Sequence, residues 1–282
     1  ALIFKGEKKD KRKWIYIEKY ENYLFIFYPY GDIFFTNLNN NQNKLSFKKI
    51  SNNLINFFEN SEYVAQTIKD VKIINKKFYV SFVNKKKDNC FNTSIVQSEL
   101  NFDYLNFDYF FNPNDCVGFK NKASGNRKIN SSGGRIEKYT NEKIFFTIGD
   151  YLKWPIAQDD EKLFGKIIEI NLKNNQNKII SKGHRNSQGL LYLKEKNILI
   201  LSEHADFGGD EINVIDLKES SISNYGYPIA SYGDHYPSTL TDEDIKKATL
   251  YKSHSKYNFV EPIKYWTPSI GPSQIVKFGN NE

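Results

Sequence analysis

Methionine is absent from this 282-residue sequence, and cysteine and histidine are scarce, with two and four copies respectively. Long apolar runs are lacking as well, because no stretch approaches the roughly 18 residues that a membrane-spanning helix needs. The sequence therefore predicts a protein without a membrane span. Only Leu2, Ile3 and Phe4 are apolar at the start, too few for a signal peptide, so we expect a processed or partial chain.

Positive charge exceeds negative charge by only seven, and the excess is spread along the chain. One basic run spans residues 8–13 and another spans residues 85–87, each beside Asp or Asn and between strand-like segments. A nucleic-acid interface would need a basic face with stacking aromatic side chains, and that alternative stays open. We interpret both runs as solvated loops and predict no nucleic-acid partner.

Both cysteines, Cys90 and Cys116, stand in polar, turn-rich stretches rather than in apolar strands. Unpaired cysteines prefer the protein interior, so this placement predicts a disulfide between the two and an oxidising compartment. We therefore expect a periplasmic or secreted location. Two unpaired thiols in a reducing cytosol remain the alternative, and no cysteine or histidine spacing indicates zinc.

Helical periodicity is scarce too, being confined to residues 52–59 and 241–249. Strand patterns dominate, and one of them, a polar residue followed by a nearly continuous apolar run, occurs four times. Its copies start at residues 32, 77, 143 and 197, which are 45, 66 and 54 residues apart. More alternating strands follow these copies at residues 45–50, 94–100, 165–172 and 210–217. A nearly continuous apolar strand is typical of a sheet that is covered on both faces.

A degenerate repeat of strand pairs predicts an all-β fold in which sheets stack around an axis, a β-propeller. The sequence holds four such units, and a fifth is expected to open at residues 268–278. We therefore predict a single, partial propeller domain over residues 1–282, an incomplete ring of about four blades plus the start of a fifth. A β-sandwich is the alternative, but it does not explain the recurring pair.

Polar clusters gather in the second half of the chain. Residues 183–190 place five hydrogen-bonding side chains between glycines, and Arg185 there offers a planar fork for a carboxylate or a quinone oxygen. Residues 202–213 carry four acidic side chains and two glycines, which suits calcium bound by carboxylates and carbonyls. A structural arginine and an acidic hairpin without an ion are the respective alternatives. Aromatic loops at residues 224–228, 231–236 and 265–269 would form a pocket at one end of the propeller.

Four motifs occur one after another in the second half of the chain. They read Gly-His-Arg-Asn-x-Gln-Gly-Leu at 183–190, Ser-Glu-His followed by Gly-Gly-Asp-Glu-Ile-Asn at 202–213, Asn-Tyr-Gly-Tyr-Pro at 224–228, and Trp-x-Pro-Ser-Ile-x-Pro-Ser at 266–273. From about residue 132 to residue 278, the chain resembles the soluble PQQ-dependent sugar dehydrogenases, the glucose/sorbosone dehydrogenase family. The resemblance implies a six-bladed propeller with pyrroloquinoline quinone (PQQ) and calcium. In that family a histidine base takes the proton of the sugar C1 hydroxyl as hydride moves to the quinone.

The resemblance also assigns roles to residues of this chain. It implies that Arg185 and Asn186 contact the quinone, and that Tyr265, Trp266 and Thr267 lie where residues stacking on its ring are expected. It implies a calcium site at four residues: Ala205 and Asp206 through their backbone carbonyls, with Asp210 and Ser269 beside them. The partners it implies are a small sugar substrate and an electron acceptor.

Two departures from the family pattern affect the prediction. The stretch that should read His-x-Gly-Gly-Arg begins here with Ser131, and a serine hydroxyl does not act as a general base unaided. The family's Gln before a Gly-Leu-Leu run has no match near residues 65–71. We therefore predict a PQQ- and calcium-dependent aldose dehydrogenase, with a catalytically diverged propeller that binds carbohydrate or protein as the alternative.

Overall fold

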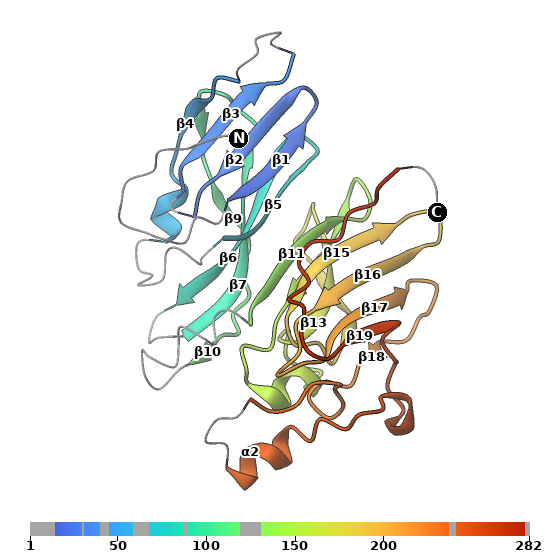
Figure 1. Ribbon diagram of the computed structural model, residues 1–282. Helices are drawn as coiled ribbons and strands as arrows, with labels where there is room; N and C mark the ends of the chain where they lie inside the picture. Colours follow the sequence, from blue (N-terminus) through green and yellow to red (C-terminus); the bar gives the residue numbers. More distant parts are fainter. Residues whose placement is uncertain are drawn as a thin grey trace.

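The computed structural model in Figure 1 describes residues 15–29, 31–39, 45–58, 68–86, 90–118, 131–236 and 241–279. The basic run at residues 8–13 lies outside these ranges, as do Lys87 and residues 65–67, where the missing Gln motif was sought. In the described part of the chain no helix is long and apolar enough to cross a membrane. Lys85 and Lys86 of the second basic run end a strand, and the Lys86 ammonium donates to the Pro113 carbonyl at 2.5 Å.

The described residues form four sheets, and the first two lie in the N-terminal half of the chain. The first sheet runs β1 (Tyr16–Tyr20), β2 (Tyr23–Phe27), β3 (Ile33–Asn37), β4 (Lys48–Asn52) and β8 (Tyr104–Leu105). The second sheet runs β5 (Ile68–Ile74), β6 (Lys77–Lys86) and β7 (Cys90–Glu99), with β9 (Asp108–Phe111) and β10 (Val117–Gly118) sharing the outer edge of β7. Within each sheet the strands therefore follow chain order, from the first strand outward.

The other two sheets repeat this plan. The third runs β11 (Gly133–Lys138), β12 (Lys143–Ile148), β13 (Lys166–Asn171), β14 (Asn177–Lys182) and β18 (Ser223–Asn224). The fourth runs β15 (Ser187–Leu193), β16 (Ile198–Glu203), β17 (Asp210–Asp216) and β19 (Lys264–Trp266). Within the described residues the helical turns are η1 (Leu54–Phe57), η4 (Trp154–Gln158), α2 (Asp242–Lys247) and η5 (Ser255–Tyr257). Two of them, η1 and α2, lie at the two helical positions that the sequence predicts.

The first strands of consecutive sheets contact one another, β1 with β5, β5 with β11 and β11 with β15 (Figure 1). Three apolar cores lie between the sheets, and each is built from side chains of two neighbouring sheets. Phe78 of β6 belongs to the first core and Phe146 of β12 to the second, both fully buried. The predicted all-β, incomplete propeller is confirmed, because four open sheets follow one another in the described ranges with their first strands in contact.

The predicted repeat is right in three sheets and out of phase in the first. The copies at residues 77, 143 and 197 form the second strands β6, β12 and β16. The copy at residue 32 is instead β3, the third strand of its sheet, because β2 already supplies the apolar second strand. The sequence could not separate the two, since Phe25 and Phe27 in β2 are as apolar as the Phe-Phe pair in β3.

The segment at residues 268–278 does not form the strand ladder expected of a fifth unit. In Figure 1 it is the red trace that runs past β19 and along β15. Its Ser273 carbonyl accepts a hydrogen bond from Ser202 Oγ at 2.6 Å, and Gln274 Oε1 accepts one from Arg135 at 2.9 Å. The close approach requires Gly189 in β15, because a Cβ there would lie 2.4 Å from the Ser273 oxygen. A ladder needs a neighbouring strand to pair with, and no described residue beyond β19 provides one.

The predicted disulfide is present. Cys90, at the start of β7, is bonded to Cys116, just before β10, and their Cα atoms are 5.4 Å apart. The bond therefore ties β10 to the strand with which it pairs.

Replacing both cysteines with serine is expected to lower the free energy of unfolding by about 3 kcal/mol, because the unfolded chain regains the entropy of a loop spanning 26 residues. Urea unfolding of the double variant and of the parent measures this difference. The parent in a thiol reductant is the matched control and should show the same loss. Identical urea midpoints for the oxidised parent and the variant would contradict the expectation.

Candidate functional site

Four segments meet at one rim of the propeller, where β11 and β15 begin and where β12 and β16 end. Backbone hydrogen bonds connect them: Tyr151 N donates to the Ser131 carbonyl at 2.9 Å and Asp150 N donates to the Arg185 carbonyl at 2.9 Å. His204 N donates to the Asn186 carbonyl at 3.1 Å. The rim therefore brings together residues that are up to 73 positions apart in the sequence, and it holds them through backbone geometry.

Ser131, the residue at the family's histidine position, contacts a buried acid that the sequence analysis did not identify. Its hydroxyl donates to Asp150 Oδ1 at 2.6 Å, and Leu152 N donates to the same oxygen at 3.0 Å. The other oxygen, Asp150 Oδ2, is buried without a hydrogen-bond partner. Burial raises the pKa of Asp150 to about 7, against the opposing effects of the Arg185 charge and of the Ser131 hydrogen bond.

Arg185 lies beside this pair and is buried as well. It donates to the His204 carbonyl at 2.9 Å and forms an ion pair with Asp206 Oδ1 at 3.2 Å, while its Nε has no hydrogen-bond partner. The Tyr227 hydroxyl donates to the second oxygen of Asp206 at 3.0 Å. Burial alone would lower the pKa of Arg185, but Asp206 and its neighbours raise it above its ordinary value, so the guanidinium remains charged.

Glu203 fixes the segment that carries Arg185. Its carboxylate accepts from Arg185 N at 3.2 Å and contacts His184 Nδ1 at 2.5 Å. The other ring nitrogen of His184 contacts Ser181 Oγ at 2.7 Å. Burial would raise the pKa of Glu203, but the charge of His184 and its hydrogen bond hold that pKa below its usual value. His184 is therefore a positioning residue within the protein.

Asn186, which the resemblance assigns to the quinone, joins two sheets. Its Oδ1 accepts from Gly133 N at 3.2 Å and from Gln188 Nε2 at 2.8 Å. Gly133 has a φ of +62°, a conformation that L side chains rarely adopt. Gly133 therefore serves this contact between the third and fourth sheets.

The residues predicted around calcium lie together, although their carboxylates are already engaged. Asp210 accepts from Ala205 N and Ser269 Oγ, both at 3.2 Å, and from the backbone nitrogens of Ile270 and Gly271 at 2.9 and 2.8 Å. These four donors occupy both of its oxygens. Over the described residues no group of three or more His, Cys, Asp or Glu is placed to hold a metal ion. A cation here would depend on backbone carbonyl oxygens, which calcium accepts.

The three residues predicted to stack on the quinone lie on or just after β19, the outer strand of the fourth sheet, whereas Arg185 precedes the inner strand β15. Three strand spacings separate β15 from β19, about 14 Å. The half-exposed Tyr265 ring stacks on Tyr232 with ring centroids 3.7 Å apart. Lys264 Nζ lies 5.9 Å from the Trp266 ring, and Thr267 packs against Gly208.

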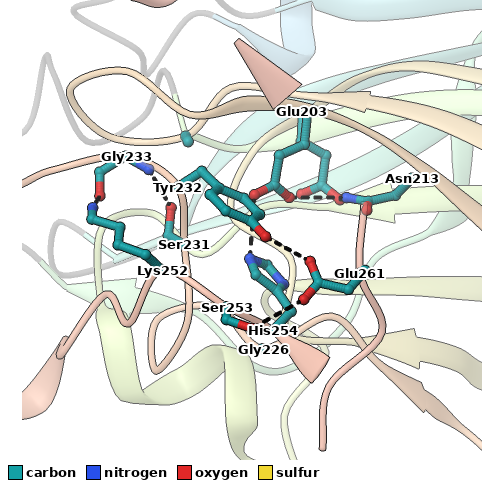
Figure 2. Close-up of polar contacts among 12 residues, drawn as sticks. Glu203, Asn213, Gly226, Ser231, Tyr232, Gly233, Lys252, Ser253, His254 and Glu261 are labelled. Carbon is teal, nitrogen blue, oxygen red and sulfur yellow. Dashed lines mark hydrogen bonds and ion pairs between the residues drawn. The ribbon is translucent and has the colours of Figure 1, made fainter. Parts of the chain in front are cut away.

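Figure 2 shows a second polar cluster, which shares Glu203 with the contacts described above. Asn213 donates to Glu203 Oε1 at 3.1 Å and to Glu211 Oε2 at 3.2 Å, so that it bridges two carboxyl groups on paired strands. Burial and the nearby Glu203 charge raise the pKa of Glu211 to about 8. His254 Nε2 lies 3.5 Å from Glu211, and its ring stacks on Tyr232.

The raised pKa of Glu211 makes a prediction about pH. Between about pH 5 and pH 8 the folded chain keeps a proton on this carboxyl that the unfolded chain has released, so its contribution to stability falls as pH rises. Glu211→Gln removes that dependence. In calcium-free buffer, the stability of the variant relative to the parent should rise by up to about 1.4 kcal/mol per pH unit across this window. Urea unfolding at several pH values measures this difference, and Glu219→Gln, at an exposed position, is the control. If the stability of Glu211→Gln and of the parent changes in parallel with pH, the prediction is refuted.

Comparison with known proteins relates this architecture to one family. The family model described as glucose/sorbosone dehydrogenase matches residues 73–282. Aldose sugar dehydrogenase YliI of Escherichia coli K12 is 28% identical over an alignment of 166 residues, and the match covers 54% of this chain and 42% of the relative. An uncharacterised protein of Synechocystis is 30% identical over an alignment of 172 residues, and the match covers 53% of this chain and 39% of the relative. The chain therefore spans about two fifths of the length of these curated relatives.

Solved structures show the same fold. The soluble aldose sugar dehydrogenase of Escherichia coli in its apo form superposes with a TM-score of 0.69 at 21% identity, covering 93% of this chain and 74% of that one. The PQQ-bound aldose sugar dehydrogenase of Streptomyces coelicolor superposes with a TM-score of 0.59 at 16% identity, covering 93% and 70%. At these identities the likeness is one of fold.

Proposed function

The chain belongs to the glucose/sorbosone dehydrogenase family, and on that premise we propose that it oxidises the C1 hydroxyl of an aldose, with PQQ and calcium at the rim described above. The observation that supports this most is the buried, charged Arg185, whose Nε has no partner. An unpaired buried donor costs free energy. A bound anion or quinone oxygen would satisfy it, and Asp150 Oδ2 is a second unsatisfied atom in the same network.

The side chains at this rim fit a ligand that carries both oxygen acceptors and negative charge. Arg185 and Asn186 would hold the quinone, which when bound supplies the hydride acceptor. The backbone carbonyls of Ala205 and Asp206 would hold calcium, and the contacts of Asp210 to Ala205 N and Ser269 keep that turn in place. The proposal does not use the Tyr265–Thr267 segment at the outer strand.

The setting of the reaction is part of the proposal. The Cys90–Cys116 disulfide supports a periplasmic or secreted location, since such bonds persist in oxidising compartments. The partners would be a small sugar and an electron acceptor that reoxidises the cofactor.

Ser131 favours a second candidate function. A chain with serine at the base position could retain the pocket and lose turnover, and it would then serve as a carbohydrate- or protein-binding module. The fold is compatible with both functions, because chemistry depends on the site and not on the architecture.

Titration of the full chain with PQQ, with and without calcium, tests the proposal. Ligand at 100 times its Kd should stabilise the folded state by about 2.7 kcal/mol, visible as a rise in Tm. Dye reduction with a panel of aldoses then separates the two functions. Binding with turnover supports the dehydrogenase, and binding without turnover supports the binding module. Absence of quinone binding at micromolar concentration would overturn the proposed function.

A further inference from the structure

We propose that Asp150 is the proton acceptor of this site and that it acts through the hydroxyl of Ser131. The inference rests on the proposed sugar oxidation and names the group that replaces the missing histidine. It is carried by the 2.6 Å hydrogen bond from Ser131 Oγ to Asp150 Oδ1 in a buried setting. Because the hydroxyl proton points at the carboxylate, the lone pairs of Ser131 Oγ remain available to accept a proton from another hydroxyl.

The backbone holds this pair in place. Ser131 O accepts from Tyr151 N at 2.9 Å, and Ser132 O accepts from Gly149 N at 2.9 Å, so the segments before β11 and after β12 are fastened on both sides of the pair. A Cβ at Gly149 would lie 2.2 Å from Ser131 O, so only glycine permits the approach. Such rigidity keeps a proton-transfer distance short without help from a substrate.

The charged surroundings suit a base that works near neutral pH. Arg185 lowers the pKa of Asp150 and Asp206 raises it, while Tyr227 contacts Asp206 in the same network. Burial dominates these effects and brings the pKa to about 7. A general base is most effective when its pKa lies near the operating pH, and a carboxylate with an ordinary pKa would be a weak one.

The proton step balances without any further group. The C1 hydroxyl gives its proton to Ser131 Oγ while the Ser131 proton moves to Asp150 Oδ1, leaving a neutral carboxyl and an intact serine. A bound ortho-quinone would supply the oxidant that takes the electron pair of the C1–H bond as hydride, so that C1 becomes a carbonyl carbon. Asp150 then releases its proton to water before the next turnover.

Asp150→Asn and Ser131→Ala test the inference, with the exposed Asp103→Asn as a control for acid-to-amide exchange. The first readout needs no cofactor. The infrared band of the Asp150 carboxyl is identified by its loss in Asp150→Asn. That band is then followed against pH in the parent and in Ser131→Ala. We expect a midpoint near 7 in the parent and a higher one in Ser131→Ala, because the Ser131 hydrogen bond lowers this pKa. An unchanged midpoint in Ser131→Ala would show that the hydroxyl is not hydrogen-bonded to this carboxyl in solution and would overturn the pair.

The second readout is turnover with PQQ and calcium. The parent should lose activity about tenfold per pH unit below pH 7, and Asp150→Asn should lose about 10²–10⁴-fold while its Kd for quinone stays close to that of the parent. If Asp150→Asn keeps its turnover and still loses activity below pH 7 as the parent does, the inference is overturned. The proposed function then still stands. If the parent binds no quinone, the proposed function fails, and the infrared titration decides alone. A midpoint near 7 that shifts in Ser131→Ala supports the pair, and a midpoint near 4 overturns it.

Discussion

Ser131→His should raise sugar-dependent turnover, but by less than the about 10²–10⁴-fold that a positioned general base contributes, because Asp150 already accepts the proton through Ser131. An imidazole has an ordinary pKa near 6.5 and accepts a proton directly, whereas serine must relay it. The structure already holds an orienting group, because Asp150 Oδ1 lies 2.6 Å from the Ser131 hydroxyl. An imidazole hydrogen-bonded to that carboxylate would be held in one orientation, in the manner of a histidine–aspartate pair.

Ser131→Asn is the matched control for this experiment. It adds a side chain of similar polarity that cannot accept a proton near neutral pH, so it reports the cost of enlarging a buried position. Turnover by dye reduction and Tm are measured for both variants. Equal turnover in the two variants, at equal quinone occupancy, would show that the absence of a histidine does not limit this site.

Arg185→Met should lower the free energy of unfolding by about 3–5 kcal/mol, because it leaves Asp206 as an unpaired buried charge. It should also raise the pKa of Asp150, from which it removes the main favourable charge, and it should abolish quinone binding. Urea unfolding at pH 7 measures the first effect. The expectation is contradicted if Arg185→Met loses less than about 1 kcal/mol.

Two further variants identify the origin of that loss. Arg185→Met combined with Asp206→Asn removes both charges and should recover much of the stability lost by Arg185→Met alone, because no buried ion is left unpaired. Arg185→Lys keeps the charge and loses the planar fork, so it should retain more stability than methionine and bind quinone more weakly than the parent. The two readouts thus separate pairing within the fold from recognition of a ligand.

The fold was predictable where the local pattern reflects burial. The strands β6 and β12 lie between apolar cores, so their sequences are continuously apolar and the repeat is visible. The first sheet was placed out of phase because β2 and β3 carry the same signal, and only the pairing of strands tells them apart. The segment at 268–278 has apolar residues at the right spacing but forms no strand, since a ladder depends on a neighbour that local sequence does not reveal.

The candidate site was predictable only in part. Arg185 and Asn186 follow a recognisable motif, and the structure places both at the rim where Ser131 also lies. Asp150 was missed because a single acid after a strand has no distinctive spacing, and its partner is 19 residues earlier. The signal that would have pointed to it is its place directly after the apolar run of β12, at the rim where β11 begins. Tyr265 lies at the outer strand, a placement that depends on strand order in three dimensions.

A crystal structure of the full chain with PQQ and calcium tests the central claim most directly. We expect quinone oxygens within hydrogen-bonding distance of Arg185 and Asn186, and calcium on the backbone carbonyls of Ala205 and Asp206. Arg185 Nε, which lacks a partner within the described structure, should then have one. Quinone bound elsewhere, or an empty rim at saturating quinone with Arg185 still paired to Asp206, would contradict the account.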